Sequence, residues 1–143
     1  MSSLVVDASV VVPWLVPEPA SAVALRLRGR ELLAPDLLFS EAANALWKKV
    51  GRGELTAVEA EAAAQLLRAV PLRVSLARDL LPRAVALAVE LAHPAYDCVY
   101  LALAEATGAP LVSDDRRLAR TVASAAGGRY RALLLPLAAV TGG

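Results

Sequence analysis

The sequence predicts an α/β fold in which a parallel sheet is covered by helices on both faces. Short β-like runs alternate with longer helical stretches along the 143 residues, and this alternation is typical of parallel sheets. The strand candidates are continuous apolar runs, as expected of strands that are buried on both faces. Repeats and linkers are absent from the sequence, and its length suits one domain, which we assign to residues 1–143.

Five strands are expected from short apolar runs that end at polar residues or turns. They are Leu4–Val6, Leu32–Ala34, Leu72–Ser75, Leu111–Ser113 and Arg131–Leu135. The first run is rich in valine and stops at Asp7, and the fourth stops at Asp114. Polar residues therefore follow directly at the carboxyl ends of two of the expected strands.

Three helical segments are expected in the first half of the chain. They are Ala8–Val16, a segment from Glu18 to Gly29, and Leu38–Val50. Pro13 makes the first of these a short helix or a turn. Pro19 suits the first turn of the second helix. Gly29 and Gly51 are expected to end the second and third helices.

Four more helices are expected in the second half. They begin near Thr56, Asp79, Asp97 and Asp115, the second running to about Leu91 and the third to Ala106. Thr56 and Glu59 have the spacing of a capping box, after which Val58, Ala62 and Leu66 recur every four residues. Asp79 can cap its helix. The helix from Asp97 is nearly all apolar and is expected to be buried, with Cys98 as a core residue.

Composition excludes several classes of protein. Hydrophobic residues make up 57% of the chain and charged residues 20%, which argues against disorder. A single cysteine excludes an internal disulfide and a thiolate metal site. The longest charge-free stretch, residues 132–143, is shorter than a membrane span and contains Pro136. The first residues do not resemble a signal peptide, so we expect a cytoplasmic protein without a membrane partner.

The net charge of +1 is not that of a typical nucleic-acid-binding domain. Arginine nevertheless outnumbers lysine greatly, because Lys48 and Lys49 are the only lysines among 15 basic residues. Arginine suits contacts to phosphate, although lineage bias in codon use explains the excess equally well. Net charge also conceals a site in which acidic residues gather and basic ones surround them.

Acidic residues fall where a parallel sheet gathers its functional groups. Ligand sites in such folds form beyond the carboxyl ends of the strands. Asp7 follows the first strand, Asp114 and Asp115 follow the fourth, and Asp97 begins the apolar helix. Glu41 lies on the helical face shared with Leu37, Leu38, Asn44 and Ala45. That face points to the core, where an unpaired carboxylate is costly.

Each acid also has a purely structural explanation. Asp7, Asp97 and Asp115 each precede a helical stretch and can be N-caps, and Glu41 can pair with an arginine. Taken together, four converging carboxylates would repel one another unless a cation lay among them. Oxygen ligands select hard ions such as Mg²⁺ or Mn²⁺. His93 precedes Pro94 and is expected to be a loop residue and not a ligand.

A carboxylate-held Mg²⁺ would serve attack on a phosphodiester. The sequence contains no Ser-His-Asp set, P-loop or Gly-rich dinucleotide motif. Haloacid-type phosphatases need a second Asp two residues after the first, where this chain has Ser9. Response-regulator receivers need a lysine after a late strand, and both lysines lie in an expected helix.

Four blocks of sequence resemble the PIN-domain family in the family's order. They are Val5–Ser9, Ala34–Leu46, Tyr96–Ala104 and Leu111–Leu118. The resemblance implies a three-layer α/β/α sandwich with a central parallel sheet. It also implies an endoribonuclease that depends on Mg²⁺ or Mn²⁺, with Asp7, Glu41, Asp97 and Asp115 as its catalytic, metal-binding acids. Ser9, Asn44 and Ser113 match positions that support these acids in the family.

A PIN domain of this size is similar to the VapC-type toxins of VapBC toxin–antitoxin systems. The similarity implies a homodimer, inhibition by a cognate VapB-like antitoxin, and an RNA substrate such as transfer RNA. The chain has Ser113 where the family usually has threonine, and it carries an additional acid, Asp114, beside the favoured Asp115. A housekeeping RNA-processing nuclease and a non-catalytic interaction domain stay open as alternatives, although the second would be expected to lack one or more of the acids.

Overall fold

The computed structural model describes residues 3–16, 27, 29–124 and 128–140. Five parallel strands form one sheet in the order β3-β2-β1-β4-β5. The strands are β1 (Leu4–Val6), β2 (Leu32–Pro35), β3 (Arg73–Ser75), β4 (Leu111–Ser113) and β5 (Leu134–Pro136). The expected parallel sheet is therefore confirmed, and the first two strands of the chain, β1 and β2, lie in the interior of the sheet with later strands on either side.

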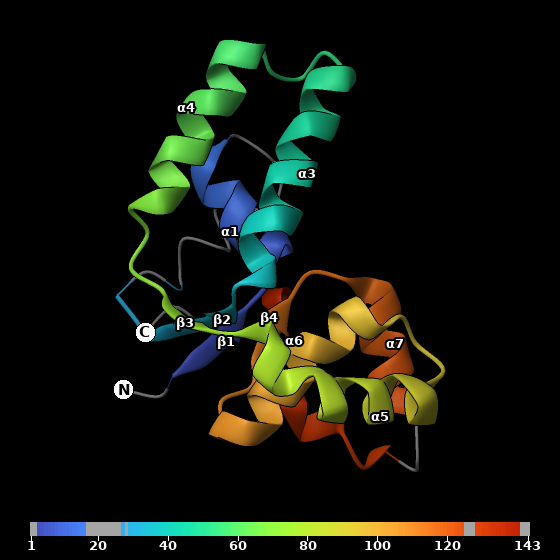
Figure 1. Ribbon diagram of the computed structural model, residues 1–143. Helices are drawn as coiled ribbons and strands as arrows, with labels where there is room; N and C mark the ends of the chain where they lie inside the picture. The colour runs from blue at the N-terminus through green and yellow to red at the C-terminus, as the bar shows by residue number, and fades with distance from the viewer. Residues whose placement is uncertain (1–2, 17–26, 28, 125–127, 141–143) are drawn as a thin grey trace.

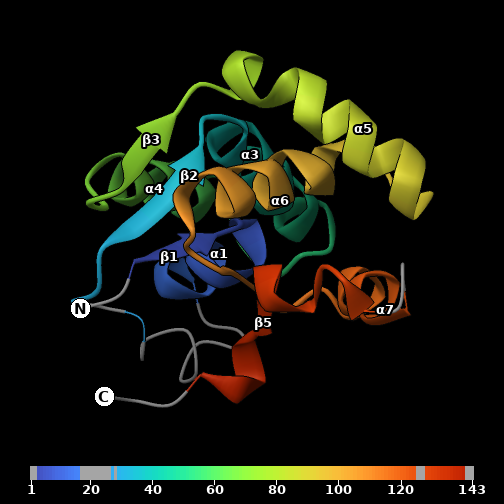
Figure 2. The ribbon, with the colours of Figure 1, turned by 90° about the horizontal axis from the view of Figure 1, so that it is seen from below.

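Helices cover both faces of the sheet, as the sequence predicted (Figures 1 and 2). One layer contains α1 (Ala8–Leu15), α3 (Leu37–Gly51) and α4 (Ala57–Arg68). The other contains α5 (Leu81–Leu91), α6 (Ala95–Thr107) and α7 (Arg116–Ser124). Short 3₁₀ turns are η2 (Ala77–Leu80), η4 (Arg131–Leu133) and η5 (Leu137–Ala139). The structure is thus a three-layer α/β/α arrangement around the parallel sheet.

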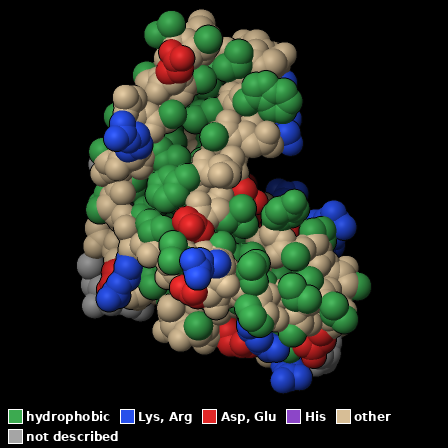
Figure 3. Space-filling view, in the orientation of Figure 1, with side chains coloured by type: hydrophobic (Ala, Val, Ile, Leu, Met, Phe, Trp, Pro, Cys, Tyr) green, Lys and Arg blue, Asp and Glu red, His purple; other side chains and the backbone are tan. Residues whose placement is uncertain are grey.

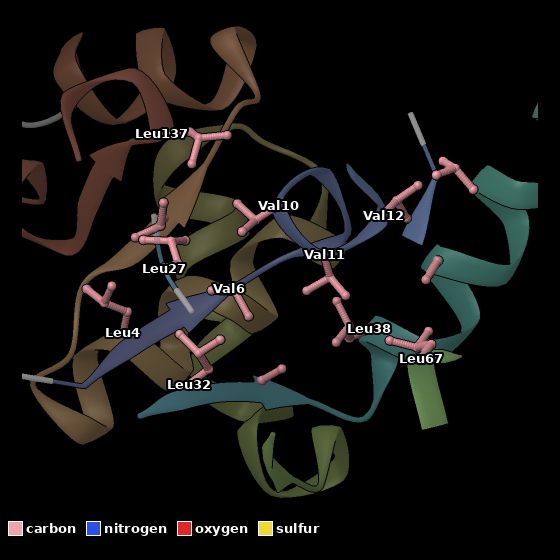
Figure 4. Close-up of a cluster of buried hydrophobic side chains, with 14 of the residues drawn as sticks. Leu4, Val6, Val10, Val11, Val12, Leu27, Leu32, Leu38, Leu67 and Leu137 are labelled. Carbon is pink, nitrogen blue, oxygen red and sulfur yellow. The ribbon is translucent and has the colours of Figure 1, made fainter. Parts of the chain in front are cut away.

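The hydrophobic core is divided in two by the sheet. Leu4 and Val6 of β1 pack with the α1, α3 and α4 layer, in the cluster drawn in Figure 4. Val5 points to the opposite face and packs with α5, α6 and α7. Because successive side chains of a strand point to opposite faces, a strand of three apolar residues fills both clusters. Cys98 is fully buried, as expected.

The fourth helix confirms its predicted start but not its predicted apolar stripe. Thr56 and Glu59 form the reciprocal capping box, with hydrogen bonds of 2.9 and 3.1 Å. The buried residues of α4 are Ala63 and Leu67. Val58 and Leu66, two members of the four-residue repeat, are 74% and 57% exposed. Tertiary packing therefore selects the neighbouring face of this helix, which carries Ala63 and Leu67.

The helix expected from Asp79 begins later. Residues Ala77–Leu80 form the 3₁₀ turn η2, and α5 starts at Leu81 with Pro82 in its first turn. Asp79 is consequently not the N-cap, and Leu80 takes that position without a side-chain bond. Proline fixes a φ angle suited to a first helical turn, which explains why the helix starts at this point.

Two further boundaries in the described residues also differ from the expected ones, at the end of α3 and at the start of β5. Gly51 is the last residue of α3, and the left-handed conformation belongs to Gly53, with φ +75°. The fifth strand begins at Leu134, since the preceding three residues form η4. The helix expected from Glu18 lies outside the described residues, whereas Gly29 has the positive φ, +88°, expected of a helix stop. None of the helices in the described ranges has the length and apolar character needed to cross a bilayer.

Candidate active site

Asp7 lies at the carboxyl end of the central strand β1 and is held there by two serines. Its Oδ1 accepts hydrogen bonds from the backbone N–H of Ser9 (3.0 Å) and from the Ser9 hydroxyl (2.6 Å). Its Oδ2 accepts a bond of 2.5 Å from the hydroxyl of Ser113, the last residue of β4. Asp7 is also the N-cap of α1, so the structural interpretation of this residue is confirmed.

The same two serines connect the ends of β1 and β4. The Ser9 hydroxyl accepts a bond from the backbone N–H of Asp114 (2.9 Å). The Ser113 hydroxyl accepts one from the backbone N–H of Asp115 (3.1 Å). Each hydroxyl thus donates to Asp7 and accepts from the loop after β4. A hydroxyl has one proton and two lone pairs, so this use fixes its orientation and that of the Asp7 carboxylate.

The electrostatic surroundings of Asp7 oppose its ionisation. Burial raises its pKa from 3.8 to about 6, while the Ser113 and Ser9 hydroxyl groups lower it and the charges of Asp97 and Glu41 raise it further. The donors that hold Asp7 are neutral, and its charged neighbours are other carboxylates. We call Asp7, Glu41 and Asp97 the acidic cluster.

Glu41 comes from α3 and is partly exposed, with its neighbour Ala42 fully buried. Its Oε1 accepts a bond of 2.5 Å from the hydroxyl of Tyr100, a buried residue of α6. Burial and the charge of Asp97 raise the pKa of Glu41, and the Tyr100 bond lowers it. Burial and Glu41 in turn raise the pKa of the Tyr100 phenol. The phenol is therefore a neutral donor that orients the carboxylate.

Asp97 lies in the first turn of α6 but does not cap it, since Pro94 is the N-cap. Its Oδ2 is 2.6 Å from Nε2 of His93. His93 belongs to the turn before α6, as expected, but its side chain is buried, and its Nδ1 lies 3.2 Å from the Thr121 hydroxyl of α7. The imidazole therefore connects Asp97 to a second helix.

Asp115 directly precedes α7, and its carboxylate is bonded to the backbone of that helix and not to the acidic cluster. Its Oδ1 accepts a bond of 3.0 Å from the backbone N–H of Leu118, which is the contact of an N-cap. Asp114 beside it is exposed, as is Asn44 on α3. The structure links Asp115 to Asp7 through the Ser113 hydroxyl, and it places Asn44 one helical turn after Glu41.

The acidic cluster has the chemical character of a hard-cation site but is open as it stands. Among the described residues, no group of three or more His, Cys, Asp or Glu side chains is arranged to hold a metal ion. The donors available are carboxylate and hydroxyl oxygens, which suit Mg²⁺ or Mn²⁺ and not zinc. Burial, and secondarily the charges of neighbouring carboxylates, raise the pKa values of Asp7 and Glu41, and a bound cation would favour their ionised forms. The residues therefore fit a divalent ion by type and by charge.

Two residues of the site were not identified by sequence reasoning. Tyr100 and His93 each hold one carboxylate of the acidic cluster. His93 precedes Asp97 by four residues and Tyr100 follows it by three, so both spacings are those of a helix turn. This spacing around Asp97 was the available signal, but without the fold it did not show that the two side chains point inward.

A hollow opens between the α3–α4 part of the molecule and the part formed by α5 and α7 (Figure 3). Acidic side chains lie at its inner end, and basic side chains lie on both rims. The first turn of α7 contributes exposed Arg116 and Arg117, directly after Asp115. Negative charge inside and positive charge outside is the distribution that the nearly neutral net charge concealed.

Comparisons with known proteins agree with this architecture. The family model described as PIN domain matches residues 4–123. A chain named Ribonuclease VapC3, from Pyrobaculum aerophilum, is 40% identical over 122 residues, which cover 81% of this chain and 92% of that one. Ribonuclease VapC1 from Mycobacterium tuberculosis is 37% identical over 123 residues, covering 83% and 90%.

A solved structure supports the fold independently. The crystal structure of PAE2754 from Pyrobaculum aerophilum superimposes with a TM-score of 0.64 at 26% identity, covering 84% of this chain and 79% of that one. The matched segment in the family model includes β1 to β4 and all residues from Asp7 to Asp115. The similarity therefore extends over the whole of the site described above.

Proposed function

The chain belongs to the PIN-domain family, and on that premise we propose that it is a metal-dependent endoribonuclease, the toxin of a toxin–antitoxin pair. The observation that carries the proposal is the acidic cluster at the carboxyl edge of the sheet, in which neutral hydroxyl groups hold Asp7 and Glu41, and burial together with neighbouring carboxylates raises the pKa of both. PIN-domain ribonucleases depend on divalent metal, and we propose Mg²⁺ or Mn²⁺ here. Residues 1–143 act as one catalytic domain in this proposal.

The residues proposed to hold the ion are Asp7, Glu41 and Asp97, with Asp115 completing the set. When bound, such an ion activates water and stabilises charge on a phosphodiester. Ser9 and Ser113 hold both oxygens of Asp7 in place. These supports are formed in the structure already, so little reorganisation of Asp7 is needed.

Basic side chains beside the site fit an RNA backbone. Arg116, Arg117 and Arg120 are exposed on α7, while Leu118 and Val122 of the same helix are buried. The helix therefore presents arginine to solvent next to Asp115, and the planar guanidinium group suits phosphate oxygens. We propose that these arginines place the RNA strand across the acidic cluster. Transfer RNA is the first substrate to test.

Two protein partners belong to the proposal, and the names of the VapC relatives support the first. One is a VapB-like antitoxin. The other is a second copy of this chain, for which α5 offers a surface: Leu81, Val85 and Val89 are 50%, 54% and 78% exposed and lie four residues apart. We expect Val89→Asp to shift the dimer toward monomer in light scattering. Val58→Asp, which changes an equally exposed valine on α4, is the matched control and is expected to leave the dimer intact.

The test of function is cleavage of total RNA, and then of transfer RNA, by the purified chain freed of any antitoxin. We expect cleavage with Mg²⁺ or Mn²⁺, none in EDTA, and none by Asp7→Asn. A metal-loaded chain without partners that leaves every RNA intact would favour the alternative of a non-catalytic PIN-fold interaction domain. Because RNA is the substrate, we place the activity in the cytoplasm.

A housekeeping RNA-processing nuclease would use the same chemistry, so a cellular experiment separates it from a toxin. We expect expression of the chain to arrest growth and Asp97→Asn to remove the arrest. A small open reading frame directly upstream, whose product restores growth when co-expressed, is expected for a toxin–antitoxin pair. Active enzyme without growth arrest would favour the processing role.

A further inference from the structure

His93 is a buried histidine that contacts the acidic cluster without being one of its carboxylates. It is 6% exposed and lies in the turn between α5 and α6. Both ring nitrogens have a polar neighbour: Nε2 is 2.6 Å from Oδ2 of Asp97, and Nδ1 is 3.2 Å from Oγ1 of Thr121. A buried side chain with both polar atoms bonded has a single orientation, so the imidazole is fixed in place.

The bonding partners determine which nitrogen carries a proton. An ionised carboxylate only accepts hydrogen bonds, so Nε2 must carry the hydrogen that is donated to Asp97. The hydroxyl of Thr121 can then donate to an unprotonated Nδ1. His93 and Thr121 in this arrangement form a short chain of donors that ends on one oxygen of Asp97. Fixing that oxygen also fixes the direction of the other.

The same contact joins the helices that carry two of the proposed ligands. Asp97 is in the first turn of α6, and Thr121 is on α7, whose first turn Asp115 caps. A movement of α7 relative to α6 would stretch the bond from His93 to Thr121. The imidazole therefore helps to set the separation of Asp97 from Asp115.

We infer that His93 is a positioning residue, which holds Asp97 by an Nε2–H donor and is itself held by Thr121, so that the carboxylate is preset to bind a divalent ion. The inference rests on the proposed function, because it assigns Asp97 to the metal. Partners that orient a metal ligand in this way typically contribute about 10–100-fold to affinity or activity.

The first test measures Mn²⁺ binding by calorimetry without RNA. We expect His93→Leu to weaken Mn²⁺ affinity by about 10–100-fold. His93→Gln should restore most of the affinity, because its amide nitrogen can take the place of Nε2 and donate to Asp97. Thr121→Val should have an intermediate effect. Tyr130→Phe is the control: it removes the bond from a different buried phenol to a carboxylate, that of Glu90, and should leave Mn²⁺ affinity unchanged.

The second test uses the fact that the chain has a single histidine. In protein labelled with ¹⁵N-histidine and purified without a histidine tag, long-range ¹H–¹⁵N spectra report one imidazole. We expect a protonated Nε2 in the folded protein. An unprotonated Nε2 would overturn the inference, since it cannot donate to Asp97. Because this readout needs neither metal nor activity, it applies even where His93→Leu fails to fold.

The outcomes separate the two proposals. Absence of Mn²⁺ binding by the wild-type chain would overturn the proposed function. Wild-type binding together with equal affinity in Thr121→Val and in whichever His93 variants fold would overturn only the positioning role. A role limited to stability would lower the melting temperature of His93→Gln and His93→Leu alike without changing the affinity of either for Mn²⁺.

Discussion

Carboxylates in this protein occupy two contrasting settings, one on the exposed surface and one in the acidic cluster. On the surface, Glu105 of α6 receives two hydrogen bonds from the guanidinium group of Arg83, at 2.6 and 2.9 Å, and Arg83 lowers its pKa. In the acidic cluster, Asp7 receives its hydrogen bonds from Ser9 and Ser113, and its pKa rises to about 6. The same chemical group is shifted in opposite directions.

Burial is the main cause of the raised pKa of Asp7, and the two settings also differ in what the partner does to the charge. A guanidinium group orients the carboxylate and neutralises it, whereas a hydroxyl orients it and leaves the negative charge in place. Asp7 and Glu41 are both oriented by hydroxyl donors, from serines and from Tyr100 respectively. Orientation without neutralisation leaves these carboxylates available to a cation from solution. The predictions below test that distinction, in order of expected effect.

The largest effect is expected on catalysis. Asp97→Asn removes a charge from the acidic cluster with little change in volume. We expect RNA cleavage to fall by more than about 100-fold, because loss even of a residue that only supports a metal ligand costs about 10–100-fold. Circular dichroism should show an unchanged fold.

Glu105→Gln makes the same chemical change on the surface of the same helix. We expect it to leave cleavage within about twofold of the wild-type rate, because the exposed ion pair of Arg83 and Glu105 takes no part in the proposed reaction. Equal loss of cleavage in both variants would contradict the distinction between the two settings. Full activity in Asp97→Asn would remove this residue from the site.

The second prediction concerns stability and pH in the absence of metal. The folded-state pKa of Asp7, about 6, lies above its ordinary value of 3.8. The folded state therefore binds the proton more tightly, so the stability that this group contributes is present below pH 3.8 and is lost as the pH rises through 6. A pKa raised from 3.8 to about 6 corresponds to a change of at most about 3 kcal/mol in the free energy of unfolding.

Urea unfolding in EDTA measures this effect. At about pH 8 we expect Asp7→Asn to be more stable than the wild type by roughly 1–3 kcal/mol. The difference should shrink as the pH is lowered to about 5, where wild-type Asp7 is largely protonated in the folded state. A destabilised Asp7→Asn at every pH would show that the lost bonds to Ser9 and Ser113 outweigh the relieved charge.

The third prediction concerns metal binding to the folded chain. Mn²⁺ that binds the folded state alone stabilises it by about 2.7 kcal/mol at a concentration of 100 Kd. In a chain of this size we expect a rise in melting temperature of roughly 5–10 °C. Asp97→Asn should lose most of this rise, and Glu105→Gln should keep it. An unchanged melting temperature of the wild type at saturating Mn²⁺ would contradict a converged site.

Much of the fold could be predicted because its elements have local signals. The short apolar runs Leu4–Val6 and Leu111–Val112 predict strands because strands buried in a parallel sheet carry apolar side chains on both faces, and the capping box at Thr56 fixes the start of α4. The buried face of α4 was not predictable. Val58 and Leu66 are apolar and periodic, yet tertiary contacts bury Ala63 and Leu67.

The candidate site, like the fold, could be predicted from the sequence only in part. The position of Asp7 and Asp115 follows from the rule that sites form beyond the carboxyl ends of parallel strands. The roles of Tyr100 and His93 could not be predicted, because their contacts to Glu41 and Asp97 depend on how α3, α6 and α7 pack. Donors that orient a carboxylate come from distant parts of the chain and leave little trace in its local sequence.

The smallest effect is expected at the surface pair itself. Arg83 and Glu105 are each more than a third exposed in their side chains, so water and salt screen their attraction. We expect Arg83→Ala to lower the free energy of unfolding by at most about 1 kcal/mol, with the loss shrinking in about 1 M salt. Neither cleavage nor the Mn²⁺-induced rise in melting temperature should change. A larger loss that persists in high salt would mean that the Arg83 stem contributes packing, since long basic side chains cover apolar surface. Such a result would mean that burial of the Arg83 stem, and not the charge of its guanidinium group, contributes most of the stability. Comparison with Glu105→Gln, which removes the partner's charge and keeps the Arg83 stem, would separate these two contributions.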